Sequence, residues 1–331
     1  QDSLVRVHRF RNVARKRLAI EAESSLVLLK AYADGVNAGL ASLKKVPFEY
    51  YALGVEPQEW KPEDSLLVLF SMFLDLQDDQ FDFEVGRGVL HDLLPKDMFE
   101  FLMAGGSEGD DPVRGGASDV PPVPGREMFD GKKLAETAAW LPGSSNEPYQ
   151  GFAYSMGSNN WAVSGKYTSD GRAMVADDMH LGIQVPHIWY RASFVWQEGT
   201  GAEHKITGVT LPGTPAMVVG SNGHIAWGFT NTEGDWADAV VVEIDPNDPT
   251  SYSTPDGPRK FENHTELIKV KGQADLPLEV VETIWGPIIK NDHAGHPLAL
   301  RWVAHDPDGV NMGLQEMETV KTLEDALQQA N

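Results

Sequence analysis

A glycine–serine step near the middle of the chain could carry nucleophilic chemistry. Ser158 follows Gly157 inside a run of alternating apolar and polar residues, which is the period of a β-strand. A serine hydroxyl is a weak nucleophile without a base, but cleavage of the bond before Ser158 would give this residue a free α-amine with a pKa of roughly 7.7 to 8.0. That amine could take the hydroxyl proton near neutral pH, as in N-terminal-nucleophile enzymes.

Glycine at position 157 suits such a self-cleavage. Without a side chain it can adopt strained backbone angles that expose its carbonyl to the Ser158 hydroxyl. From the residue types alone, however, a glycine and a serine side by side in a strand are more often structural. The functional interpretation of this step therefore depends on the motifs around it.

Three separated motifs resemble the penicillin acylase (penicillin amidase) family, and they occur in the family's order. Its members are N-terminal-nucleophile hydrolases that cleave an amide bond of penicillins, cephalosporin side chains or N-acyl-homoserine lactones. The matching segments are Tyr32–Ala38, Ser158–Gly165 with Ser169–Gly182, and Gly220–Thr232. The resemblance implies that Ser158 starts the catalytic β chain after a cut at Gly157. It also implies the four-layer αββα sandwich of this superfamily.

Two further residues gain catalytic roles from this resemblance. His180 matches the histidine that bonds and orients the nucleophile in those acylases that use histidine here, although Met179 departs from the proline often found before it. The backbone N–H of Asn231 matches a donor to the oxyanion of acyl transfer. Without the resemblance, His180 would be a structural hydrogen-bonding residue and Asn231 part of a turn. The family's second donor and a nearby arginine would fall past Asn331.

Carboxylates after the third motif could hold Ca²⁺. Asp235 and Asp238 lie three positions apart after a glycine, and hard oxygen ligands in a turn suit this ion. Acid pairs in loops are common in a chain this acidic, so the pair alone would be a solvated loop. The resemblance adds the Ala237 carbonyl and the Glu84 carboxylate to a family calcium site.

The resemblance also assigns an acyl-binding pocket to three apolar residues, Leu74, Leu181 and Val219. Core packing is the alternative role of each, and the two roles are compatible. Leu181 and Val219 are aliphatic where some relatives have phenylalanine. We expect a pocket with this lining to favour an aliphatic acyl chain over phenylacetyl.

Periodicity places these residues on helices first and strands afterwards, which predicts an α+β fold. Apolar residues at helical spacing predict a helix over 23–45, and Pro62 with two following acids predicts another helix start. The glycine- and proline-rich region 104–157 is expected to be a flexible connector that overlaps the family's removed spacer. The predicted domains are 1–103, this connector, and 158–331. Strands are expected throughout the last part, including 187–197, 239–244 and 278–289.

Composition narrows the class of partner. The net charge of -22 disfavours nucleic acid and anionic membranes, and zero cysteines exclude disulfides and a cysteine nucleophile. We expect no membrane span, because no apolar run reaches the necessary length, and we expect no signal peptide within the first residues of this sequence. Because family precursors extend beyond both ends, we expect an internal portion of a periplasmic or secreted precursor.

The resulting hypothesis is an acylase that acts on a small N-acylated molecule, assembled from the α and β chains of one precursor. The alternative is a non-catalytic, calcium-dependent binding module on the same fold. The two differ in one property, because only the acylase requires cleavage at Ser158.

Overall fold

The computed structural model describes residues 2–77, 80–104, 121–125, 158–197, 199, 201, 203–232 and 234–330. Two compact units are present. The first contains the described residues of 1–78, 152–234 and 303–331, and the second contains those of 79–151 and 235–302. Each unit therefore combines residues from both sides of the predicted connector. Most of that connector, Gly157 included, lies outside the described residues, so the predicted domain boundaries stay predictions.

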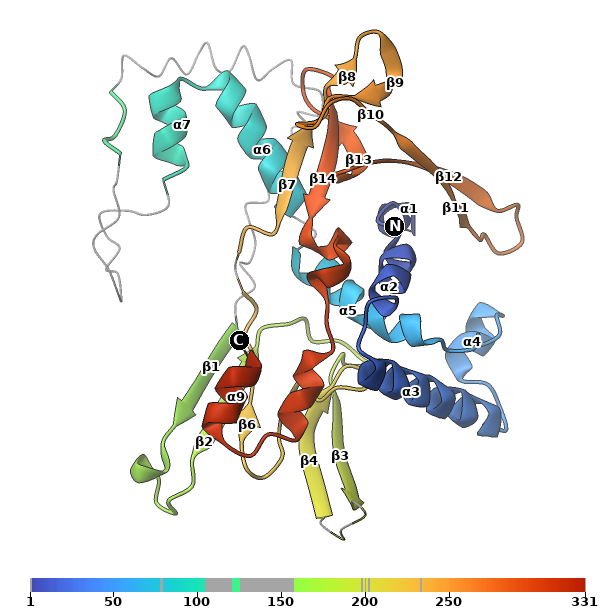
Figure 1. Cartoon of the computed structure of the whole chain (residues 1–331), viewed down its shortest axis with the longest axis vertical. Helices are drawn as coiled ribbons and strands as arrows, with labels where there is room; N and C mark the ends of the chain where they lie inside the picture. The colour runs from blue at the N-terminus through green and yellow to red at the C-terminus, as the bar shows by residue number, and fades with distance from the viewer. Residues whose placement is uncertain are drawn as a thin grey trace. The chain divides into compact units, whose positions relative to one another are not determined.

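Five helices begin the first unit (Figure 1): α1 (Asp2–Arg6), α2 (Phe10–Leu18), α3 (Glu23–Ser42), α4 (Phe48–Leu53) and α5 (Pro62–Gln77). The predicted start of α5 is confirmed, with Pro62 in the first turn and two acids beside the positive end of the helix dipole. Phe10 of α2 stacks on Phe70 of α5 with ring centroids 4.8 Å apart. Both side chains are buried, so this aromatic pair anchors the two helices to each other.

The strands of the first unit form two antiparallel sheets. A hairpin pairs β1 (Ser158–Val163) with β2 (Met174–Met179). A second sheet joins β3 (Tyr190–Gln197), β4 (Glu203–Thr210), β5 (Val219–Ser221) and β6 (Ala226–Trp227) in chain order. The unit ends with short 3-10 turns, including Gly313–Glu318, and with α9 (Leu323–Ala330). A buried cluster ties these parts together: Ile206, Met217, Trp227, Met317 and Ala326.

The second unit contains α6 (Gln80–Leu93), α7 (Lys96–Leu102) and two further antiparallel sheets. The five-stranded sheet has the order β11 (Glu262–Ile268), β12 (Leu276–Thr283), β13 (Gly286–Asn291), β14 (Pro297–Trp302) and β7 (Ala237–Val241). The three-stranded sheet has the order β10 (Arg259–Lys260), β9 (Asp248–Tyr252) and β8 (Ile244–Asp245). Helices followed by antiparallel strands confirm the predicted α+β class.

Two predicted strands are each divided in the structure. The span 278–289 contains parts of β12 and β13, which are joined by a turn in which Thr283 pairs with Gly286. Gly286 has a φ of 137°, a backbone angle open to glycine, and this permits the sharp reversal. The span 239–244 likewise includes the end of β7 and the start of β8. Within the described residues, no helix is both long and apolar enough to cross a membrane.

The first family motif has a structural role in the first unit. The Asn37 side chain accepts a hydrogen bond from the Trp60 backbone N–H and donates one to the Trp60 carbonyl, both at 2.8 Å. The Tyr32 hydroxyl accepts the Gly213 N–H at 3.1 Å. These bonds attach α3 to the start of α5 and to the loop after β4.

Gly213 is a position at which a methyl group is expected to be costly. Its φ is +106°, and a Cβ there would lie 2.7 Å from Val68 Cγ2 and 3.0 Å from the Trp60 ring. We expect Gly213→Ala to lower the free energy of unfolding by about 3 kcal/mol, from backbone strain and overpacking together. Gly257→Ala is the matched control, because Gly257 has a φ of +108° with open space around it. Equal losses in thermal stability would show that the steric clash contributes nothing.

A histidine pair joins the beginning and the end of the first unit. His8 Nδ1 and His305 Nε2 are 3.1 Å apart in a hydrogen bond, and the His8 ring stacks on Phe10. Burial lowers the pKa of His8 from its ordinary value of 6.5 to about 4. The charged imidazolium is therefore disfavoured in the folded chain.

This lowered pKa predicts a loss of stability in acid. Between pH 6.5 and 4 the unfolded chain binds a proton at His8 that the folded chain does not, so stability falls as pH decreases through this window. The full contribution is on the order of 3 kcal/mol. We expect His8→Gln to flatten the dependence of Tm on pH over this window. An unchanged pH dependence of Tm in His8→Gln would contradict this account.

Candidate active site

Ser158 is the first residue of β1 and is half-buried. Its cross-strand partner is Met179, and the register continues through Asn159 with Asp178 and Asn160 with Asp177. Because side chains alternate between the two faces of a strand, Ser158 shares a face of the hairpin with Asn160 and Asp177. The hairpin thus fixes the position and direction of the predicted nucleophile.

His180 follows β2 directly, beside the start of β1. Its Nε2 atom lies 3.1 Å from Asn159 Nδ2 and 3.2 Å from Asp178 Oδ2. Asn159 and Asp178 are cross-strand partners on the face of the hairpin opposite to Ser158. In the described part of the chain, His180 is therefore bonded to the neighbours of Ser158, and its predicted bond to the serine hydroxyl stays a prediction.

The segment that contains Asn231 reaches the same hairpin. The Phe229 backbone N–H donates to Asp177 Oδ2 at 3.2 Å. Gly228 lies so close to Asn160 and Asp177 that a Cβ on it would be 2.9 Å from a side-chain atom of each. Asn231 lies two residues after Phe229 and is half-buried. The structure therefore brings the segment of the predicted oxyanion donor onto the strand pair that begins with Ser158.

The three residues predicted to bind the acyl group all lie in the first unit and are all half-buried. Leu74 is on α5, Leu181 follows β2, and Val219 begins β5. Leu181 therefore lies beside the hairpin, and Val219 is part of the second sheet. Their common role as a pocket stays a prediction.

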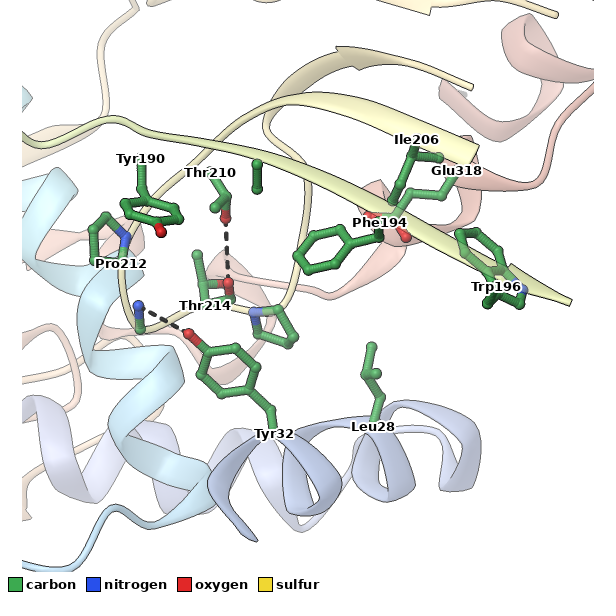
Figure 2. A pocket seen from close by; sticks show the side chains of 13 residues that line it. Leu28, Tyr32, Tyr190, Phe194, Trp196, Ile206, Thr210, Pro212, Thr214 and Glu318 are labelled. Atoms are coloured by element: carbon green, nitrogen blue, oxygen red, sulfur yellow. Dashed lines mark hydrogen bonds between the residues drawn. The ribbon is translucent and has the colours of Figure 1, made fainter. Parts of the chain in front are cut away.

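A separate apolar cavity of about 630 Å³ lies between α3, the β3–β4 pair and the loop after β4 (Figure 2). Its lining residues are Leu28, Tyr32, Tyr190, Ala192, Phe194, Trp196, Ile206, Thr210, Pro212, Gly213, Thr214, Pro215 and Glu318. Glu318 is the only carboxylate among them. It accepts the Met217 N–H at 3.0 Å, and burial raises its pKa. The cavity lining includes neither Ser158 nor the predicted acyl-binding residues.

The residues predicted to bind calcium belong to the second unit, but the described residues do not assemble them into a site. No group of three histidine or acidic side chains in the described residues is arranged to hold a metal ion. Glu84 Oε1 accepts a hydrogen bond from Arg87 Nη1 at 2.7 Å, so the negative charge of Glu84 is paired with the positive charge of Arg87. Asp238, on β7 beside Ala237, is opposite Arg301 of β14. Asp235 is exposed just before this strand.

Sequence reasoning missed the structural contacts inside the motifs. Asp177 and Gly228 both lie within matched segments, but their contact joins positions about fifty residues apart and depends on the register of β1 with β2. Asn222 in the third motif donates to the Val320 carbonyl at 2.6 Å and so holds the segment before α9. The motifs were the available signal, whereas these partners required the fold.

Comparison with known proteins agrees with the motifs. A family model described as penicillin amidase matches residues 1–331. Acyl-homoserine lactone acylase QuiP of Pseudomonas aeruginosa is 27% identical over 320 residues, which are 90% of this chain and 35% of that protein. Penicillin acylase 2 proenzyme of Pseudomonas sp. strain SE83 is 28% identical over 324 residues, which are 91% of this chain and 38% of that protein.

A solved structure is also similar. Thermostable penicillin G acylase from Alcaligenes faecalis aligns with a TM-score of 0.36 and 24% identity, over 43% of this chain and 26% of that chain. The chain spans less than two fifths of the length of the two relatives named above. Because the family model matches the whole of the chain, the resemblance that the three motifs indicated is confirmed. The chain belongs to the penicillin amidase family.

Proposed function

We propose that this chain is the part of an N-acyl amide hydrolase that contains the nucleophile, Ser158. The observation that carries the proposal is the convergence of two family motifs on one hairpin: the strand that begins with Ser158, and the Gly228–Asn231 segment that is bonded to it through Asp177. The match of the penicillin amidase family model to residues 1–331 and the relatives named as acylases support the reaction class.

The mechanism begins with maturation. The Ser158 hydroxyl attacks the Gly157 carbonyl carbon, and the C–N bond then breaks, which releases the α-amine of Ser158 and leaves an ester between Gly157 and the Ser158 oxygen. Water hydrolyses this ester to give the Gly157 carboxylate and the free Ser158 hydroxyl. In each later turnover this amine takes the hydroxyl proton through a water molecule while the oxygen attacks the substrate amide. The amine product leaves with a proton, and a second water hydrolyses the acyl ester to release the acid.

Two residues assist these steps in the proposal. The Asn231 backbone N–H donates to the negative oxygen of the tetrahedral intermediate. His180 orients the nucleophile strand, and its contact with Asn159, the residue next to Ser158, supports this role. Neither residue changes its covalent bonds in the reaction.

For the substrate, we propose an N-acylated small molecule such as an N-acyl-homoserine lactone or a penicillin. The named relatives support both classes. An acyl pocket lined by Leu74, Leu181 and Val219 would favour aliphatic chains, because none of these side chains offers an aromatic face. The proenzyme name of one relative supports maturation from a single precursor into α and β chains, which we place in the periplasm or outside the cell.

Calcium remains a separate proposal, with Glu84, Asp235, the Ala237 carbonyl and Asp238 as ligands. No catalytic step depends on it. Arg87 pairs with Oε1 of Glu84 in this structure, so its positive charge would compete with a cation bound by the same carboxylate. If the site binds calcium, a chelator should lower the Tm of full-length protein and added Ca²⁺ should restore it, and Asp235→Asn should remove this response. An identical Tm with chelator and with Ca²⁺ would contradict the proposal.

The main experiment measures cleavage and activity together on the full-length protein. Intact-mass and N-terminal analysis should find a fragment that begins at Ser158. The same preparation should hydrolyse members of a panel that contains N-acyl-homoserine lactones of short, medium and long acyl chains and phenylacetyl para-nitroanilide. Active protein with an uncut chain would refute the mechanism. Uncut, inactive protein that binds small N-acylated molecules only when Ca²⁺ is present would favour the binding module.

A further inference from the structure

Asp177 connects two segments that are distant in sequence and adjacent in the proposed site. It lies on β2 opposite Asn160, one side-chain position along the same hairpin face from Ser158. Its Oδ2 atom accepts the Phe229 backbone N–H at 3.2 Å. We propose that Asp177 is a positioning residue, which holds the segment with the Asn231 N–H at a fixed place relative to the Ser158 strand. This inference rests on the function proposed above.

Glycine at position 228 makes this connection possible. A Cβ on Gly228 would be 2.9 Å from Asp177 Oδ2, 2.9 Å from Asn160 Nδ2 and 3.1 Å from Asp177 Cβ. Such distances are shorter than van der Waals contact, so a larger residue would displace the Asp177 and Asn160 side chains from these positions. The absent side chain and the carboxylate therefore act together: one allows the approach, and the other fixes it with a charge-assisted hydrogen bond.

The second oxygen of Asp177 distinguishes this residue from an ordinary structural acid. Asp177 Oδ1 is buried and has no hydrogen-bond partner among the described residues. A buried carboxylate oxygen without a partner costs free energy, so stability alone does not favour an aspartate at this position. Residues that break such local rules are concentrated at functional sites.

The position of the Asn231 segment matters to catalysis, because an oxyanion donor must already be in place before the negative charge develops. The N–H must lie within hydrogen-bond distance of an oxygen that becomes negative in the transition state, and it contributes little to binding of the neutral substrate. Asn231 is two residues from Phe229, so loss of the Asp177 bond would displace the donor. The expected signature is a lower kcat with an almost unchanged KM.

The test compares Asp177→Asn and Asp177→Leu in the full-length protein, assayed on the best substrate of the amide panel. Leucine has a similar shape but no acceptor, and we expect it to lower kcat by about 10²-fold with KM within about threefold of wild type. Asparagine keeps an acceptor oxygen for the Phe229 N–H, and we expect it to retain kcat within about fivefold. Glu203→Gln removes an exposed charge from β4 of the same unit and is the control, with expected kcat unchanged.

Gly228→Ala provides an independent arm if the leucine variant does not fold. We expect it to reproduce the loss of kcat at constant KM, because a methyl group there would displace the Asp177 carboxylate from its bond with the Phe229 N–H. Wild-type kcat in Asp177→Leu or, where that variant fails, in Gly228→Ala would overturn the inference, and so would an equal loss in Asp177→Asn and Asp177→Leu. The proposed function is tested separately, because Ser158→Ala must be inactive whatever Asp177 does.

Discussion

Ser158→Ala is expected to leave the Gly157–Ser158 bond intact and to abolish amide hydrolysis by the full-length protein. Alanine has no hydroxyl to attack the Gly157 carbonyl, so the α-amine that serves as the base never forms. One substitution thus removes both the nucleophile and its activator, and we expect kcat to fall by about 10⁶-fold, as when the serine of a catalytic triad is removed. Intact-mass analysis and the amide panel measure the two effects on one preparation.

Two variants make this result specific. Ser164→Ala changes an exposed serine just after β1, and it should be cut and active like the wild type. Ser158→Thr keeps a hydroxyl and a potential α-amine, and N-terminal threonine nucleophiles are known, so it should retain detectable cleavage. Processed and active Ser158→Ala protein would exclude residue 158 as the nucleophile and would end the proposed mechanism.

The sequence predicted those elements whose residues carry a local signal. α5 begins where Pro62 and its neighbouring acids predicted, and β3 lies within the predicted strand 187–197. β14 was not predicted, because Leu298, Ala299 and Leu300 are all buried and the strand lacks alternation of apolar and polar residues. Periodicity identifies strands with one buried face and misses those that are covered on both.

The sequence supplied the candidate residues of the site, whereas their contacts depend on the fold. The motifs identified Ser158, His180 and Asn231, but the register of the hairpin determines that His180 bonds Asn159 and that Asp177 meets Phe229. The calcium prediction also depended on contacts that the sequence does not specify. Acidic residues at suitable spacing in the sequence do not specify that Glu84 bonds Arg87 in the structure.

Asn231→Pro is expected to produce the second large effect, a decrease of about 10² to 10³ in kcat. Both the cleavage before Ser158 and the amide hydrolysis are measured on the full-length protein. The proposed donor is a backbone N–H, and proline is the one residue that lacks it. The comparison variant is Asn231→Ala, which deletes the side chain and keeps the N–H. If the backbone donates to the oxyanion, alanine should stay within a few fold of wild type.

A third variant, compared with these two, separates loss of the oxyanion donor from a general change in the backbone of the segment. Proline also restricts the backbone of the residue before it, so Thr230→Pro, which keeps the Asn231 N–H, is the control for a proline in this segment. Loss of the donor should lower kcat and leave KM nearly constant, because the bond forms only as charge develops on the substrate oxygen. An equal loss in Asn231→Ala and Asn231→Pro would assign the function to the side chain and contradict a backbone donor at this position.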